Sequence, residues 1–345
     1  MEGQFVMEKE GDVKKNTGIS ILRLFLCFEV FYNHYSTEPD TIIEKVANLF
    51  RGIPVPCFIF LSFYLTYQIF DTQNKRKLMN RLKRLFYPLV FWNLIYYLYH
   101  WVHQGELLSY EQLIYSFILG AVKTLDFPLW YLSSEIMIIG ILWMLSERQT
   151  EEENRNIIIF TFIGVFAVFM VVTGCNYYLF NGMPFESIFT FGRTLEIVPM
   201  AVLGYIYAEY ENRLKKSFIY ITALLLVVVS LILRYTWVDI KFGFGYQFVW
   251  QNILSIAIVL LFINLPQIRS VRLARIINYV AQFTMGAYCL QVMVCSILLE
   301  IGWLHIYAPI SSLWFDIVSY VCCMLIAFLL YLASKKVPIL RYMVI

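Results

Sequence analysis

The feature that most constrains this chain is a series of long apolar runs, each long enough to cross a lipid bilayer. About 20 mostly apolar residues in a helix span the hydrocarbon core of a membrane. Only 15% of the residues are charged, whereas about a quarter are charged in an ordinary soluble domain. The sequence therefore predicts an all-α, polytopic membrane protein of about ten transmembrane helices, at residues 18–36, 53–71, 86–103, 128–146, 156–174, 190–209, 217–235, 247–265, 279–300 and 312–334.

The positions of Lys and Arg predict how these helices are oriented, because cytoplasmic loops carry an excess of both residues. Basic clusters recur in alternate loops and at both ends of the chain, which requires an even number of spans. We therefore expect a cytoplasmic N-terminal tail at 1–17, one membrane domain at 18–336 and a cytoplasmic C-terminal tail at 337–345. The segment 107–125 carries spaced polar residues and is predicted to be an amphipathic helix at the outer interface.

The seven cysteines are scattered, and none of them forms a CxxC pair. This arrangement predicts neither a disulfide framework nor a metal site. We interpret the cysteines as small apolar residues of the helix core.

Ionisable residues inside a predicted span are costly and usually mark a functional site. The first span contains Arg23 and His34, which are eleven residues apart. This spacing is close to three helical turns, so both side chains lie on one face about 16 Å apart. Arg can hold a phosphate or carboxylate, and His can take and return a proton near neutral pH. Alternatively, Arg23 extends to the headgroups and His34 lies at the outer interface. Glu29 lies off this face, where it could pair with another helix.

Further charged residues fall within the fourth and sixth predicted spans. Glu135 lies in 128–146, and Arg193 and Glu196 lie three residues apart in 190–209. Each is either a residue that lines the same cavity as Arg23 and His34 or part of a structural ion pair. By contrast, four residues near outer ends are interpreted as interfacial anchors or solvated groups, namely His100, His103, Glu300 and Asp316.

Several motifs occur in the order found in a known family of membrane proteins. Arg23-x10-His34 on the first helix is similar to the signature of acyltransferase family 3, whose members O-acylate sugars, lipopolysaccharide, peptidoglycan and other acceptors. The segment PVPCFIFLSFYLTY resembles the family's V-P-x-F-F-x-x-S-G-F-x-L, with Phe63 in place of the usual glycine. NRLKRLFYPLVFW resembles its R-x-x-R-x-x-x-P motif, through Arg81, Arg84 and Pro88.

The resemblance continues through the second half of the chain. FPLWYLSSEI is similar to the family's P-L-W-F-L segment, and the stretch from Phe191 to Gly204, with Arg193, is similar to its sixth span. FTMGAYCLQVMV resembles the segment S-x-G-I-Y-L-x-H, but Gln291 replaces the usual histidine. The resemblance therefore covers nearly the whole chain.

The resemblance implies an acyl-CoA-dependent O-acyltransferase without a tightly bound cofactor. Acyl-CoA, with acetyl-CoA expected, would be the cytoplasmic co-substrate, and the acceptor would be a hydroxyl of a surface or cell-wall glycan or of a lipid-linked sugar. His34 would act as the general base or carry the acyl group transiently. Arg23 would contact the donor phosphates or the developing oxyanion. Arg81 and Arg84 would bind the adenosine phosphates, or would anchor the chain to lipid headgroups.

The same resemblance implies a bacterial plasma-membrane protein. Its partners would be membrane lipids and the machinery of polysaccharide synthesis, and no nucleic acid is expected. The competing hypothesis is a transporter or flippase for a lipid-linked sugar or polysaccharide, in which the in-membrane charges form a substrate or proton path. However, the two halves of the sequence show no repeated pair of Gly/Pro-broken spans.

Overall fold

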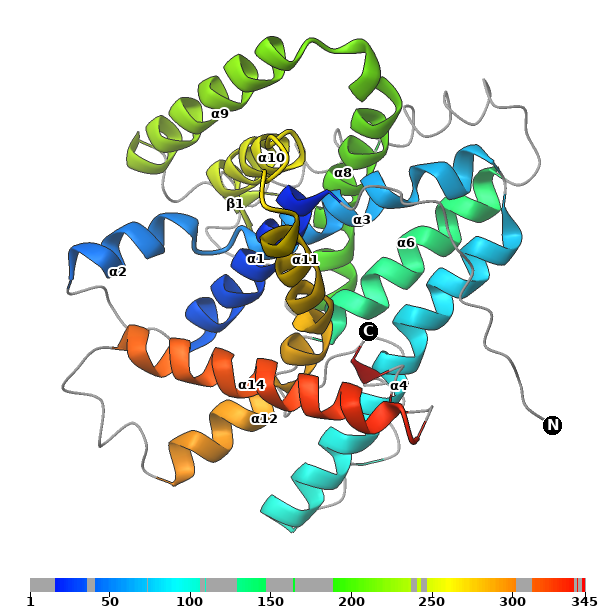
Figure 1. The fold of residues 1–345 in the computed structure, drawn as a ribbon, viewed down its shortest axis with the longest axis vertical. Coiled ribbons are helices and arrows are strands. Elements are labelled where there is room, and N and C mark those ends of the chain that lie inside the picture. The colour runs from blue at the N-terminus through cyan, green and yellow to red at the C-terminus, as the bar shows by residue number, and fades with distance from the viewer. Residues whose placement is uncertain are drawn as a thin grey trace, which may run out of the picture.

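The computed structural model describes residues 16–35, 41–72, 74–105, 109, 129–146, 164, 189–236, 241–242, 247–301, 312–337, 340 and 343–344. This part of the chain is helical apart from one small hairpin (Figure 1). The long helices are α1 Thr17–Tyr35, α3 Pro54–Asp71, α4 Lys75–Gln104, α6 Trp130–Ser146, α8 Phe189–Tyr210, α9 Lys216–Thr236, α10 Val249–Ile263, α11 Val271–Val280, α12 Thr284–Glu300 and α14 Ser312–Ser334. The short elements are α2 Ile42–Ala47, η1 Asn48–Phe50, η4 Glu211–Arg213, η5 Ala281–Phe283 and the antiparallel strands β1 Lys241–Phe242 and β2 Gln247–Phe248.

The predicted all-α fold class is confirmed for the described residues. Each predicted span that falls within them coincides with a helix, whereas 156–174 and 107–125 lie outside them apart from Gly164 and Ser109. By length and composition, three described helical segments could each cross a membrane, and one bent pair passes the same criteria together. These are Lys216–Thr236, Val271–Glu300, Leu313–Ser334 and the pair Ile42–Phe50 with Pro54–Phe70. The number of ten spans and the cytoplasmic position of both ends stay predictions.

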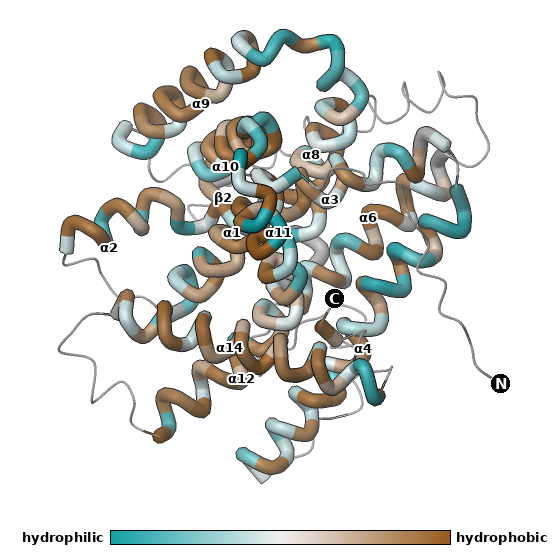
Figure 2. Tube along the Cα trace, viewed as in Figure 1, coloured by the Kyte–Doolittle hydropathy of each residue, from teal (hydrophilic) through white to brown (hydrophobic). Residues whose placement is uncertain are grey.

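The apolar surface of α9 and α14 is largely on the outside of the protein. Figure 2 shows hydrophobic residues along most of α9, α12 and α14. On α9, Leu224 is 65% exposed and Leu225 is 59% exposed. Large exposed apolar faces mark interaction or membrane surfaces, so this distribution suits a protein surrounded by lipid.

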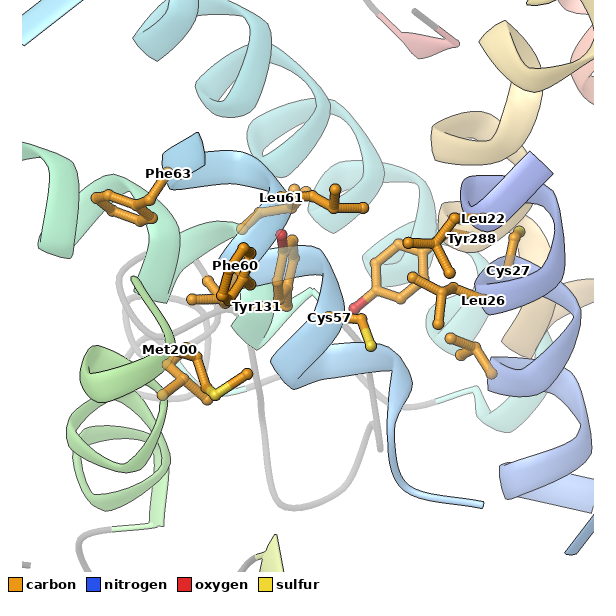
Figure 3. Close-up of a cluster of buried hydrophobic side chains, with 14 of the residues drawn as sticks. Leu22, Leu26, Cys27, Cys57, Phe60, Leu61, Phe63, Tyr131, Met200 and Tyr288 are labelled. Carbon is orange, nitrogen blue, oxygen red and sulfur yellow. The ribbon is translucent and has the colours of Figure 1, made fainter. Parts of the chain in front are cut away.

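The centre of the fold is formed where α1, α3, α6, α8 and α12 meet. Figure 3 shows Leu22, Leu26 and Cys27 of α1 on one side of Tyr288, with Cys57 of α3 near Tyr288 and with Phe60 and Leu61 of α3 beside Tyr131. Helices α3 and α8 approach closely because α8 has a glycine at their contact. A Cβ atom at Gly204 would collide with the backbone carbonyl oxygen of Phe60. The absence of a side chain at Gly204 therefore sets the distance between α3 and α8.

Helix α14 packs against α1 through Tyr320. The Tyr320 ring makes edge contacts with Phe28 and Phe31, and its hydroxyl donates a hydrogen bond to the Leu24 carbonyl oxygen at 3.2 Å. Near the start of α14, Asp316 is 0% exposed. The expectation of a solvated Asp316 was therefore wrong.

Two further predictions concern polar residues of α1 and α4. Glu29 is buried, and it interacts electrostatically with Asp316 of α14, which is a second carboxylate and not a cation. On α4, His103 is exposed and its Nε2 lies 3.0 Å from Glu300 Oε1. His100, however, is buried between helices, so its interpretation as an interfacial anchor was wrong.

The described part of the C-terminal segment packs inside the helical bundle. Met343 and Val344 are buried, and Trp92 Nε1 of α4 donates a hydrogen bond to the Met343 carbonyl oxygen at 3.1 Å. Val344 lies against Gly286 of α12, where an added Cβ would meet Val344 Cγ1 at 3.1 Å. Met343 and Val344 thus contact both α4 and α12.

Candidate active site

Three polar side chains from three different helices, α3, α4 and α6, meet inside the fold. Arg81 Nη2 donates to Glu135 Oε1 at 2.9 Å and to Ser62 Oγ at 2.6 Å. Ser62 Oγ in turn donates to Glu135 Oε1 at 2.5 Å. Glu135 is 2% exposed and Ser62 is 7% exposed. A carboxylate in such a position requires a cation and a hydroxyl group to compensate for its lost hydration.

Helix α4 can deliver Arg81 to this position because it begins well before the predicted span. The side chain of Asn74 accepts a hydrogen bond from the Lys77 amide and caps the helix. Helix α4 then continues through Pro88 to Gly105, whose φ of 71° ends it in the left-handed conformation. The basic residues 75–84 therefore form a rigid extension of the apolar helix, and Arg81 points from this extension toward α3 and α6.

Arg23 lies close to the same group of residues. It is half-buried on α1, and its Nη2 donates to Thr284 Oγ1 of α12 at 3.2 Å. Arg23 also interacts electrostatically with Tyr131 and with Arg81. Two guanidinium groups thus share the region around Glu135, which supplies a single negative charge. This excess of positive charge suits the binding of an anionic group.

His34 lies at the other end of α1, where its side chain is exposed. The rise of the helix separates it from Arg23 by about 16 Å, so the two residues share a face but do not meet. The C-terminal end of α1 is connected to the segment before α3 by Asn33, whose Oδ1 accepts a hydrogen bond from the Gly52 amide at 2.9 Å. Gly52 adopts a φ of 86°, which favours glycine at this position. His34 is therefore held at the start of the α1-to-α2 connection.

Arg84 differs from Arg81 in its surroundings. Its side chain is exposed, and no hydrogen bond or ion pair of Arg84 is present among the described residues. The side chain of Arg81 is 24% exposed and is directed to Glu135. The two residues are neighbours on α4, but the structure places only Arg81 in the buried group.

The other two predicted site residues lie on α8, beside α6. The guanidinium of Arg193 lies 5.3 Å from the centre of the Trp130 ring, which is a cation–π distance. Glu196 is buried. Between them, Thr194 Oγ1 lies 2.6 Å from Ser134 Oγ, the residue adjacent to Glu135. These contacts connect α8 to the helix that carries Glu135.

A family model described as an acyltransferase domain matches residues 16–332, which is nearly the whole chain. The chain belongs to the acyltransferase 3 family. No match was found among the curated proteins or among the solved structures. The predicted resemblance is therefore confirmed at the level of the family, and with it the general activity of a membrane acyltransferase.

Within this acyltransferase, sequence reasoning missed two hydroxyl residues that contact the predicted arginines. Ser62 contacts Arg81 and Glu135, and Thr284 contacts Arg23. Ser62 occupies the serine position of the family's S-G-F motif, which was a usable signal. Thr284 lies in the family-like segment FTMGAYCLQVMV, but only the packing of α12 against α1 identifies its partner.

The acyltransferase departs from the family pattern at Gln291, which is 0% exposed on α12. Neither atom of its side-chain amide has a hydrogen-bond partner within the described part of the chain. Thr284 and Gln291 are seven residues apart, close to two turns, and therefore share one face of α12. Among the described residues, no group of three or more His, Cys, Asp and Glu side chains could hold a metal ion.

Proposed function

We propose that this acyltransferase moves an acyl group, most simply acetyl, from cytoplasmic acyl-CoA to a hydroxyl of a surface or cell-wall glycan or of a lipid-linked sugar. The main support is the match to the family over residues 16–332. The distribution of charge along α1 supports the same proposal. The positive charge of Arg23 and Arg81 lies at one end of α1, and the imidazole of His34 lies at the other.

The basic end of α4 is the part of the structure best suited to bind the donor phosphates. Its exposed cationic side chains are those of Lys75, Arg76, Lys77, Lys83 and Arg84. Phosphates are bound well by such groups, and an arginine can form two parallel hydrogen bonds to them. In this proposal Arg84 contacts the donor, whereas Arg81 positions the basic end of α4 through Glu135 and Ser62.

The chemical step is assigned to His34 at the outer end of α1. Its imidazole takes the proton of the acceptor hydroxyl while the oxygen attacks the thioester carbonyl carbon. A C–O ester bond forms, the C–S bond breaks, and the thiolate of CoA leaves and then takes a proton. About 16 Å of helix separates Arg23 from His34. The donor would therefore lie extended along α1, with its phosphates near Arg23 and the basic end of α4.

Purified protein with radiolabelled acetyl-CoA tests this function. The proposal predicts steady loss of the thioester that depends on an added glycan, with label recovered on the glycan. It also predicts that Arg84→Ala raises the KM for acetyl-CoA with little change in kcat, because Arg84 contacts the donor before and after transfer. Glycan binding or movement without thioester loss would favour the transporter hypothesis instead.

A further inference from the structure

Helix α11 differs from the other long helices because none of its residues is buried. It is ten residues long, begins at the capping residue Ser270 and runs into η5 and α12 (Figure 1). The combined segment Val271–Glu300 has 30 residues, or about 45 Å of helix, whereas the hydrocarbon core is about 30 Å thick. If α12 occupies the core, α11 therefore lies at the level of the headgroups.

One side of α11 carries a stripe of basic and aromatic side chains. Arg272, Arg275 and Tyr279 follow each other at spacings of three and four residues, which places them on the same side of the helix. Both arginines are exposed, and neither has a protein partner among the described residues. The sequence contains no Asp or Glu between Asn264 and Glu300, so nothing nearby along the chain neutralises this charge.

The end of α14 adds a further cation to this stripe. The Tyr279 ring makes an edge contact with Tyr331, with 6.4 Å between ring centres. Lys335 Nζ lies 5.8 Å from the centre of the Tyr331 ring. Phe283 of η5 contacts both tyrosine rings, at 5.3 Å from Tyr279 and 5.4 Å from Tyr331. These contacts place Lys335 on the same side as the α11 stripe, next to the tyrosine rings.

A second side of α11 is apolar and equally uncovered. Leu273 is 47% exposed and Ile276 is 52% exposed. Ile277 and Val280 complete this side and are half-buried. Figure 2 shows hydrophilic and hydrophobic residues adjacent on α11. A helix with one basic and one apolar side typically lies in the plane of the membrane interface.

We propose that α11, together with Lys335, is a binding site for the headgroup of an anionic phospholipid. The phosphate is bound by Arg272, Arg275 and Lys335, and Tyr279 and Tyr331 lie at headgroup level, where tyrosine is enriched. The side with Leu273 and Ile276 faces the acyl chains. Negative lipids attract basic segments next to the membrane, by a factor of about five in affinity for each Lys or Arg.

The apolar side favours a lipid over a soluble phosphate compound as the ligand. A soluble ligand would use the cationic groups and leave Leu273 and Ile276 uncovered. A phospholipid covers both sides at once, because its phosphate and its acyl chains are joined. The cationic residues of this site lie on α11 and α14 and differ from those assigned to the donor, which lie on α1 and α4.

Native mass spectrometry of the purified full-length protein tests the proposal. The protein is incubated with phosphatidylglycerol or phosphatidylcholine, and the retained lipid is measured for the wild type and for Arg272→Gln/Arg275→Gln. We expect the wild type to retain phosphatidylglycerol in preference to phosphatidylcholine. Loss of two cations should weaken retention of phosphatidylglycerol about 30-fold.

The matched control is Lys215→Gln/Lys216→Gln at the start of α9, which removes two exposed cations from a loop near Glu209 and Glu211. This control should retain phosphatidylglycerol like the wild type. Arg272→Lys/Arg275→Lys keeps both charges and should retain most of the phosphatidylglycerol binding. This result would show that α11 tolerates substitution at both positions. The proposal is overturned if both Gln variants weaken retention equally, if the two lipids are retained equally, or if coenzyme A displaces the phosphatidylglycerol.

Discussion

The buried contact of Arg81 with Glu135 predicts that the two residues contribute unequally to stability. Arg81→Ala leaves Glu135 almost fully buried, with the hydroxyl groups of Ser62 and Tyr131 as neutral partners and no cation bound to it. Glu135→Gln leaves Arg81, whose side chain is 24% exposed and can turn toward water or headgroups. The first change should therefore be the more damaging, although both remove the same ion pair.

The expected magnitudes follow from the burial of the group that remains. Removing one partner of a buried ion pair costs about 3–5 kcal/mol, and we expect Arg81→Ala to fall in this range. Glu135→Gln keeps the volume and loses a charged hydrogen bond, which costs about 2 kcal/mol. The double variant should cost about 2 kcal/mol less than the sum of the single changes, because it contains no uncompensated buried charge.

Unfolding of the purified protein by SDS in mixed micelles measures these free energies. Arg84→Ala is the matched control, because it removes the same side chain three residues away at an exposed position. It should change the free energy of unfolding by less than about 0.5 kcal/mol. Equal costs for Arg81→Ala and Glu135→Gln, or strictly additive costs in the double variant, would refute the reasoning.

Three further predictions follow from the described contacts. Gly204→Ala should destabilise the protein by several kcal/mol, since its Cβ would collide with the backbone of Phe60, whereas Gly140→Ala on α6 meets nothing within 4 Å and should be neutral or stabilising by about 0.5–1 kcal/mol. Thermal unfolding of both variants checks this difference, and equal melting temperatures would contradict it. Arg23→Lys should lower acetyl transfer at least ten-fold with normal expression, because Lys keeps the charge but not the planar fork; full transfer activity would reduce Arg23 to an anchor. Glu29→Gln should raise the melting temperature, because it removes a buried carboxylate whose Oε2 has no partner among the described residues; a lower melting temperature would show that the carboxylate is stabilising.

The positions of the helices could be predicted well from the sequence. The apolar runs reflect the requirement to satisfy backbone hydrogen bonds within lipid, which each helix meets by itself. The prediction therefore needed no knowledge of neighbouring segments. It missed the extension of α4 over residues 75–85, because the charges there end the apolar run without ending the helix.

The candidate site could be predicted only in part. The spacing of Arg23 and His34 predicted their common face, because both residues lie on one helix. The contacts of Arg81 with Ser62 and Glu135 join three helices, and such contacts depend on packing that local spacing does not encode. The sequence therefore grouped Arg81 with Arg84 as a phosphate clasp, whereas the structure directs Arg81 to Glu135. Asp316 was misjudged for the same reason, since its burial also depends on how the helices pack.

Mass spectrometry of surface polysaccharide tests the central claim most directly. Cells carrying the wild type or His34→Ala are compared for the mass of an O-linked acyl group, with membrane expression of both proteins confirmed. The account predicts an acyl mass, expected to be acetyl, on the glycan from wild-type cells and none from His34→Ala cells. Unmodified glycan in both, with a different amount at the cell surface, would contradict the enzyme assignment and favour a transporter.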